Sequence, residues 1–214
     1  NSELIFAKNM FHVSKVDNKI NNIKYSISNI YNNKTEYIDC DLTGLYQSEN
    51  IATALTSFAV LNRIKALKIS KKVIVNGLKN VISNTQFLGR WQALQDAPKL
   101  IVDCAHNAAG IQSVFNNFKT KKNKNVFIIF GCVSDKDLHA IAPLLPKSAQ
   151  YLITQPTVQR AKPFEETAKT LAKFGINIIY KNKSTLKTLQ TALRQANDTD
   201  SIIAIGSVFL VADI

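Results

Sequence analysis

The first 42 residues alternate apolar and polar positions in short segments, a spacing that predicts β-strands. The segments with this pattern are 4–6, 23–28 and 36–40. Asn-rich connectors separate them, and Tyr31-Asn32-Asn33-Lys34 has the composition of a hairpin loop. The beginning of the chain is therefore predicted to be β-rich.

After Gly44 the apolar residues recur at helical spacing. This pattern predicts one helix over about 48–62 and a second that begins after Ser70, whose hydroxyl suits an N-cap. The second helix carries Val73, Ile74, Leu78 and Ile82 on one face. It ends in polar residues, which places a domain boundary near 83–86 and gives the predicted domains 1–84 and 85–214.

From residue 87 onward, strands and helices alternate. The apolar runs that predict strands are 99–102, 126–130, 151–154, 176–180 and 201–205, and the helical patterns between them are 109–118, 138–145, 164–174 and 186–196. Strands separated by single helices are typical of a mainly parallel sheet that is covered on both faces. We therefore expect a Rossmann-like α/β domain that follows a smaller α+β segment.

The pentapeptide Asp103-Cys104-Ala105-His106-Asn107 joins an apolar strand to a helical pattern. Open α/β sheets bind ligands at the carboxyl ends of their strands, and helix N-termini suit anions. Taken singly, Asn107 is an N-cap and Asp103 a turn former. The whole cluster, with Gly89-Arg90 upstream, predicts a ligand site. The fork of Arg90 suits phosphate, although without the neighbouring motif a surface salt bridge would be the simpler interpretation.

Three further strand ends carry polar or glycine-bearing turns. Asp135-Lys136-Asp137 either positions an acidic substrate or caps the next helix. Arg160 is a candidate clamp for a carboxylate. Gly206-Ser207 either offers backbone N–H groups and a hydroxyl to a ligand or is a structural turn.

Composition limits the classes of partner that the chain could bind but does not identify one. The 214 residues carry a net charge of +12, which favours anionic partners. The lysines are scattered and no aromatic residues interleave with them, so a solvated surface is the commoner explanation. Three cysteines without CxxC spacing indicate a reducing cytoplasm, no disulfide framework and no zinc site. No apolar stretch approaches the roughly 20 residues needed to cross a bilayer.

The seven glycines exclude two phosphate-binding motifs from this chain. No two of them have the G-x-G spacing of the dinucleotide fingerprint, and none is followed by the Lys of a P-loop. If the chain handles ATP, polypeptide outside these residues must hold most of the phosphates.

Taken together, these motifs resemble the folylpolyglutamate synthase/dihydrofolate synthase family in their order and spacing. That family belongs to the Mur ligase group of ATP-dependent amide-forming ligases. The motifs are Gly89-Arg90, the pentapeptide from Asp103, Asp135-Lys136-Asp137, Arg160-Ala161 and Gly206-Ser207. Upstream, the segment from Leu45 to Asn50 resembles the family's H-Q-x-x-N motif, with Tyr46 in place of His. Cys104 replaces the usual Gly, and Ala108 the usual Pro.

The resemblance implies that this chain is the C-terminal half of a three-domain enzyme. Residues 1–84 would close a central ATPase domain, and residues 85–214 would form the Mur ligase C-terminal domain. The missing N-terminal part would carry the P-loop, the Mg²⁺ ligands and most of the pterin site. A monomeric, cytoplasmic enzyme acting on ATP, L-glutamate and pteroate or folate is implied, with no nucleic acid or membrane partner, and the isolated chain is expected to be inactive.

The resemblance also implies roles for individual residues. Asn50, Arg90 and Asp103 would contact ATP, His106 would lie near the γ-phosphate and the reacting carboxylate, and Ser207 near the incoming glutamate. Lys136 and Arg160 are the further candidates for substrate binding, and no metal ligand is expected in this chain. Two alternatives stay open: a Mur-type peptidoglycan precursor ligase, and a non-catalytic basic α/β module that binds nucleic acid.

Overall fold

The structure is a computed structural model that describes the chain except residues 1–2, 20–21, 33, 45, 117 and 119–123. Asn33 of the predicted hairpin loop, Leu45 of the H-Q-x-x-N-like segment and residue 117 of a predicted helix thus lie outside the described residues. The chain forms two compact units, Asn1–Leu88 and Gly89–Ile214. The division falls between Leu88 and Gly89, shortly after α3 (Val81–Thr85), and the sequence pattern places the boundary after residue 84.

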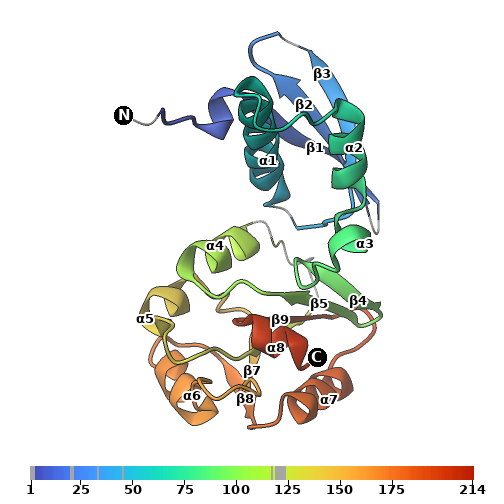
Figure 1. Ribbon diagram of the computed structural model, residues 1–214. Coiled ribbons are helices and arrows are strands. Elements are labelled where there is room, and N and C mark those ends of the chain that lie inside the picture. The colour runs from blue at the N-terminus through green and yellow to red at the C-terminus, as the bar shows by residue number, and fades with distance from the viewer. Residues whose placement is uncertain (1–2, 20–21, 33, 45, 117, 119–123) are drawn as a thin grey trace. The chain divides into compact units, whose positions relative to one another are not determined.

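Unit 1 (Asn1–Leu88) contains a three-stranded antiparallel sheet packed against two helices (Figure 1). The strands are β1 (Phe11–Lys19), β2 (Asn22–Asn29) and β3 (Thr35–Cys40), in the order β1-β2-β3. The helices are α1 (Gln47–Arg63) and α2 (Lys71–Lys79). The apolar face predicted for the second strand is buried, since Ile23, Tyr25 and Ile27 pack in one cluster with Ile51 and Leu55 of α1.

Two details of unit 1 differ from the sequence prediction. The predicted strand 4–6 has no sheet partner and leads into a 3₁₀ turn, η1 (Ala7–Asn9), while the unpredicted β1 pairs with β2. An irregularity between Lys15 and Asp17 breaks the alternation in β1, which hides its strand signal. The second helix is capped by Ser70 as expected but ends at Lys79, so Ile82 belongs to α3. The carboxylate of Asp41 accepts the N–H groups that begin α3, at 3.1 and 2.8 Å.

Unit 2 (Gly89–Ile214) is built on a six-stranded sheet, and the prediction of a mainly parallel sheet is confirmed. The strands are β4 (Gln92–Asp96), β5 (Lys99–Asp103), β6 (Val126–Phe130), β7 (Gln150–Ile153), β8 (Ile178–Lys181) and β9 (Ser201–Ile205). Their order is β4-β5-β9-β6-β7-β8, and only the edge strand β4 is antiparallel to its neighbour. β4 is largely exposed, so it lacks the apolar run that would have predicted it.

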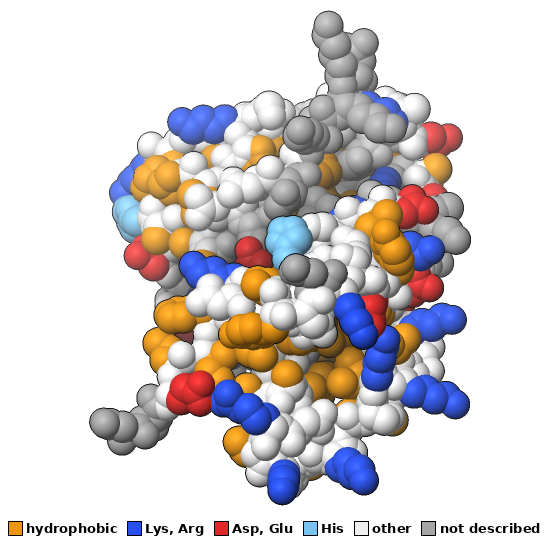
Figure 2. Space-filling model, turned by 90° about the horizontal axis from the view of Figure 1, so that it is seen from above, with side chains coloured by type: hydrophobic (Ala, Val, Ile, Leu, Met, Phe, Trp, Pro, Cys, Tyr) orange, Lys and Arg blue, Asp and Glu red, His pale blue; other side chains and the backbone are white. Residues whose placement is uncertain are grey.

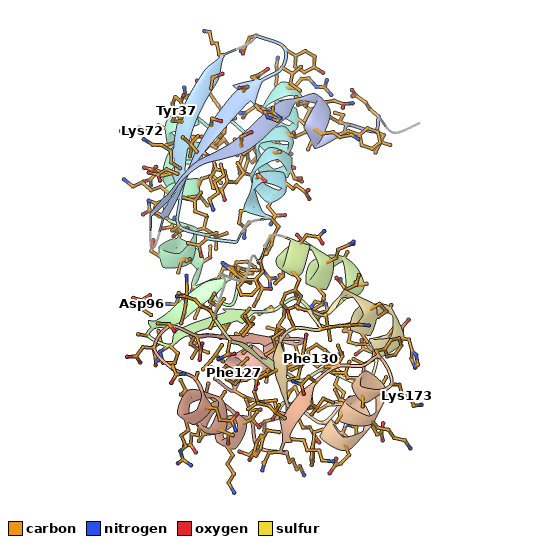
Figure 3. All side chains as sticks on the ribbon, turned by 180° about the vertical axis from the view of Figure 1, so that it is seen from behind. Tyr37, Lys72, Asp96, Phe127, Phe130 and Lys173 are labelled. Carbon is orange, nitrogen blue, oxygen red and sulfur yellow. The ribbon has the colours of Figure 1, made fainter. Side chains whose placement is uncertain are left out.

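Helices cover both faces of this sheet. They are α4 (Ala108–Asn116), α5 (Leu138–Ile141), the 3₁₀ turn η2 (Ala142–Leu144), α6 (Phe164–Ala172), α7 (Thr185–Gln195) and α8 (Val208–Ala212). Phe127 packs in the cluster that includes Leu189 of α7 and Leu210 of α8. Phe130 has the opposite parity along β6 and is fully buried, so it faces the other side, where α4, α5 and α6 lie (Figures 1 and 3). Among the helices of the described residues, none combines the length and the apolar character that a membrane span requires.

Asp200 ties the amino ends of β6 and β9 together and supplies a pH-dependent prediction. Its buried carboxylate accepts the N–H groups of Asn125 and Asn197, both at 2.9 Å. Burial raises the pKa of Asp200, but these hydrogen bonds outweigh burial and hold the pKa below its usual value. A lowered carboxyl pKa stabilises the fold above the unfolded pKa of about 3.9, and this stability is lost as the pH falls through the folded pKa.

We therefore expect Asp200→Asn to lower the free energy of unfolding by about 1–3 kcal/mol at pH 7. Urea denaturation at pH 7 and at pH 3 should show that the difference from the parent chain shrinks in acid. Asp198→Asn, two residues away on the exposed surface, is the matched control and should change little. A cost of Asp200→Asn that is equal at both pH values would contradict the role of the ionised carboxylate.

Candidate functional site

The turns that follow β5, β9, β6 and β7 converge at one edge of the sheet in unit 2. The N–H of Gly206, after β9, donates to the carbonyl of Ala105, after β5, at 3.0 Å. A Cβ on Gly206 would lie 2.6 Å from the carbonyl oxygen of Gly131, after β6. The N–H of Thr154, after β7, donates to Phe130 O at 2.9 Å. Since the β5 turn leads to α4 and the β9 turn to α8 on the other face, this edge has the topology at which open α/β sheets bind ligands.

Asp103 holds the turn that carries Arg90 against this edge. One carboxylate oxygen accepts the N–H of Trp91 at 2.8 Å, and the other accepts the N–H of Ala105 at 2.8 Å. The turn is sharp, because Gly89 and Trp91 have φ values of 75° and 52°, both in the left-handed region. Asp103 is only 1% exposed, so in the described structure its carboxylate acts on the backbone that orients Arg90. The sequence pattern drew attention to Asp103 but did not reveal this positioning role.

Arg90 lies beside the buried thiol of Cys104. Burial raises the pKa of Cys104, and the nearby Arg90 guanidinium partly opposes that rise. Packing is the role expected for this cysteine, and its side chain fills the space next to Gly89. A Cβ on Gly89 would lie 2.6 Å from Cys104 Sγ, so the turn requires glycine there both for space and for its positive φ.

His106 is exposed at the same edge, and its ring is oriented by the backbone. Its Nδ1 lies 2.9 Å from the carbonyl oxygen of Cys104. A carbonyl only accepts, so Nδ1 donates and the neutral ring keeps Nε2 as its proton acceptor. Asn107 has the structural role considered for it, because its Oδ1 accepts the N–H of Gly110 at 2.8 Å in the first turn of α4.

The Asp135-Lys136-Asp137 triplet combines a helix cap with a charged pair. Asp137 caps α5 by accepting the N–H groups of His139 and Ala140, at 2.9 and 3.2 Å. Lys136 pairs with Asp135 at 3.1 Å. The hydrogen bond from Lys136 lowers the pKa of Asp135, and the charge of Arg160 adds to this effect. Lys136, in the turn after β6, thus pairs with Asp135, and Arg160, in the segment after β7, acts on this carboxylate through its charge.

Arg160 and Ser207 both contact Phe209 of α8. The guanidinium carbon of Arg160 lies 5.2 Å from the centre of the Phe209 ring, a cation–π contact. Ser207 Oγ accepts the N–H of Phe209 at 3.1 Å and so caps α8, and the Ser207 side chain is buried. The Gly206-Ser207 turn therefore has a structural role, since Gly206 N–H is also bonded within the protein.

The structure thus gathers most of the predicted site residues at one edge. His106, Lys136, Arg160 and Ser207 belong to the converging turns of unit 2, Asp103 ends β5, and Arg90 lies in the turn before β4 that Asp103 holds. Asn50 belongs to unit 1, in the first turn of α1, where its side chain donates to Gln47 Oε1 at 2.8 Å.

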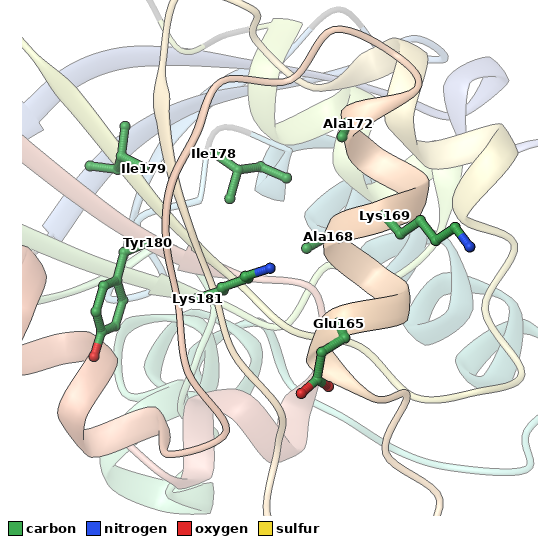
Figure 4. Close-up of a pocket in the computed structure, with 8 residues that line it drawn as sticks. All are labelled: Glu165, Ala168, Lys169, Ala172, Ile178, Ile179, Tyr180 and Lys181. Atoms are coloured by element: carbon green, nitrogen blue, oxygen red, sulfur yellow. The ribbon is translucent and has the colours of Figure 1, made fainter.

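Two hollows of the described surface are lined by other residues. A groove of about 390 Å³ runs between α6 and the edge strand β8, where Ala168 and Ala172 face the strand (Figure 4). A second, of about 630 Å³, lies along α2 in unit 1 and is lined by residues that include Lys72 (Figure 3). On the face drawn in Figure 2, Lys and Arg side chains are dispersed and form no continuous stripe. None of the predicted site residues lines either groove.

Comparison with known proteins locates the chain among ligases. The family described as "Mur ligase, glutamate ligase domain" matches residues 89–208. A curated relative, the dihydrofolate synthase/folylpolyglutamate synthase of Buchnera aphidicola subsp. Baizongia pistaciae, is 25% identical over 167 residues, which is 77% of this chain and 37% of the relative. The sequence prediction of this family is confirmed.

Solved structures share the fold. Escherichia coli FolC in complex with ADP superposes with a TM-score of 0.71 at 23% identity, over 94% of this chain and 44% of that one. A bifunctional folylpolyglutamate synthase/dihydrofolate synthase with Mn, AMPPNP and L-glutamate bound gives 0.66 at 20% identity, over 88% and 42%. The chain thus spans less than half the length of each of these proteins.

Proposed function

Because the chain belongs to the Mur ligase family through its glutamate ligase domain, we propose that it serves an ATP-dependent ligase that joins L-glutamate to the carboxylate of dihydropteroate or a folate. One observation carries this proposal: Asp103 fixes the Arg90 turn at the sheet edge where the β5 and β9 turns meet. A guanidinium at the same sheet edge as a histidine with an accepting Nε2 suits phosphate binding and proton transfer there. The names of the relatives supply the substrate class.

In this proposal the chain is the C-terminal part of the enzyme. Unit 1 closes a central ATPase domain, and unit 2 is the ligase domain that closes over the bound nucleotide. The glycine census supports this division, because the chain offers no P-loop for the phosphates. Mg²⁺ would neutralise phosphate charge, and we assign its ligands mainly to polypeptide that precedes this chain. In the described part of the chain, no three His, Cys, Asp or Glu side chains form a metal-binding group.

The chemistry begins with a carboxylate, which is a poor acyl electrophile because its negatively charged oxygen is a poor leaving group. Transfer of the γ-phosphoryl group of ATP to this carboxylate gives an acyl phosphate and ADP. The amino group of glutamate then attacks the acyl carbon, phosphate leaves, and the amine loses a proton. The protein contributes positioning and neutralisation of charge in both steps.

The family resemblance and the positions of the residues support the following roles. Arg90 supplies positive charge to the transferred phosphate, and Asp103 holds it there through the Trp91 N–H. His106 accepts or relays the proton through Nε2. Lys136 and Arg160 attract the carboxylates of glutamate, and the Ser207 turn supports that subsite. Asn50 contributes to the nucleotide site from unit 1.

The test is an assay of the complete gene product for phosphate release that depends on ATP and L-glutamate. Dihydropteroate or folate is expected to support turnover, UDP-linked carboxylates are not, and the 214-residue chain alone is expected to show none. Turnover with UDP-linked acceptors only would favour a Mur-type peptidoglycan ligase. Ligation by the chain alone would contradict the division between domains. Salt-sensitive binding of nucleic acid that survives Arg90→Ala would favour the basic module instead.

A further inference from the structure

The segment that carries Arg160 has little secondary structure of its own, yet it is fixed at several points. It follows β7, and its end pairs with the β6 turn through the bridge between Val133 and Ala161. The N–H of Ser134 donates to the carbonyl of Arg160 at 2.9 Å. These bonds fix the backbone of Arg160, but its long exposed side chain needs a separate support to hold one direction.

That support comes from the last helix of the chain, α8. The ring of Phe209 lies under the Arg160 guanidinium at 5.2 Å, and the carboxylate of Asp213 accepts the N–H of Thr157 at 2.7 Å. Phe209 and Asp213 are four residues apart and joined by a backbone hydrogen bond of 3.1 Å, so they lie on one face of α8. Thr157 contacts Asp213 and Arg160 contacts Phe209, so both residues of the segment lie against that face. One helical turn thus binds the backbone of the segment at Thr157 and its side chain at Arg160.

The same carboxylate reaches a buried group of hydroxyls. Asp213 Oδ2 also lies 3.4 Å from Thr185 Oγ1, which in turn lies 3.4 Å from Thr154 Oγ1. Thr154 and Thr185 are 0% and 4% exposed. The Asp213 contact therefore joins the end of β7, the start of α7 and the end of α8.

We propose that Asp213 is a positioning residue that fixes Arg160 in the glutamate subsite. The inference deepens the proposed function, on which the role of Arg160 in binding glutamate rests. The family match ends at residue 208, so neither Phe209 nor Asp213 lies in the matched range. Ser207 caps the beginning of α8 and Asp213 lies at its end. This short helix therefore connects the Ser207 turn to Phe209, the residue whose ring contacts Arg160. Asp213 itself touches no substrate in this proposal.

The direct test is NMR spectroscopy of the 214-residue chain, with the ring-current shifts of the Arg160 side-chain protons as the readout. Phe209→Leu gives the reference values without the ring. Asp213→Ala is expected to move the Arg160 shifts most of the way to that reference and to speed exchange of the Thr157 amide at least about tenfold. Asp213→Asn keeps a side-chain oxygen for the Thr157 N–H and should give intermediate values.

The matched control is Asp200→Asn, which weakens a similar carboxylate cap at the opposite ends of the strands. It should lower stability and leave the Arg160 shifts unchanged. Arg160 shifts that persist in Asp213→Ala, or that move equally in Asp200→Asn, would overturn the positioning role, because the contact would then be purely structural.

A kinetic arm separates this inference from the proposed function. In the complete gene product, Asp213→Ala should raise the KM for L-glutamate with little change in kcat, and should raise it little further when Arg160→Ala is already present. If the two substitutions raise the KM for L-glutamate additively, the proposal that Asp213 acts through Arg160 is overturned. If Arg160→Ala leaves the KM for glutamate unchanged, the subsite assignment within the proposed function fails, while the NMR result still decides whether Asp213 positions Arg160.

Discussion

Replacing Gly206 with Ala is expected to lower the free energy of unfolding of unit 2 by about 2–6 kcal/mol. Two costs add. Gly206 has a φ of 122°, which L-residues rarely adopt, and this strain costs about 1–3 kcal/mol. The new Cβ would also lie 2.6 Å from the backbone oxygen of Gly131, an overpacking that costs about 1–3 kcal/mol more. Chemical denaturation measures the sum.

Two other glycines separate these costs. Gly175 has a φ of 72° with no neighbour near its would-be Cβ, so Gly175→Ala should lose only about 1 kcal/mol, from backbone strain. Gly77 lies within α2 with open space around it, and Gly77→Ala should stabilise unit 1 by about 0.5–1 kcal/mol. A loss for Gly206→Ala no larger than for Gly175→Ala would show that the turns after β9 and β6 separate easily. Convergence of the strand ends would then be a weak constraint on the site.

Replacing Arg90 with Ala is expected to lower kcat/KM of the proposed ligase by about 100- to 1000-fold. Removing one well-placed charge donor from a site where negative charge develops has an effect of this size. The effect should appear in kcat as well as in the KM for ATP, because the guanidinium would serve the transferred phosphoryl group. The complete gene product is assayed by release of phosphate that depends on L-glutamate.

Matched variants make this result specific. Arg90→Lys keeps the charge without the planar fork and should recover only part of the activity. Arg194→Ala removes an exposed arginine from the last turn of α7 and should leave turnover unchanged. The single tryptophan, Trp91, is adjacent and its N–H is bonded to Asp103, so its fluorescence reports whether the turn keeps its structure. Full activity in Arg90→Ala with unchanged Trp91 emission would remove Arg90 from the phosphate site.

The central strands were predictable because burial on both faces imposes a continuous apolar run. β6 (Val126–Phe130) and β9 (Ser201–Ile205) have the bounds that the pattern predicts. The edge strand β4 lacks such a run, and the helix α8 is apolar but only five residues long, too short to show a helical period; both were missed. β1 was missed because its alternation is interrupted, and the segment 4–6, although apolar, found no partner in a sheet.

The same division applies to the site. Local sequence singled out Asp103, His106 and Arg90, because polar residues that end apolar strands collect at one edge of a parallel sheet. It gave no sign that Asp103 would be buried against the Trp91 N–H, or that Asp213 would reach Thr157 across 56 residues. Those contacts join segments that are distant in sequence, and a local pattern cannot predict them.

The sequence alone therefore determined the alternation of strands and helices, the mainly parallel sheet, the family, and the absence of a phosphate cradle in this chain. Each of these follows from the period of apolar residues or from short motifs, which are local properties. Only the tertiary structure decided which strands are neighbours, that Gly206 must lie against Gly131, and that α8 grips the segment of Arg160. These depend on how the chain returns through α7 to place β9 between β5 and β6, where packing of the whole sheet selects the arrangement.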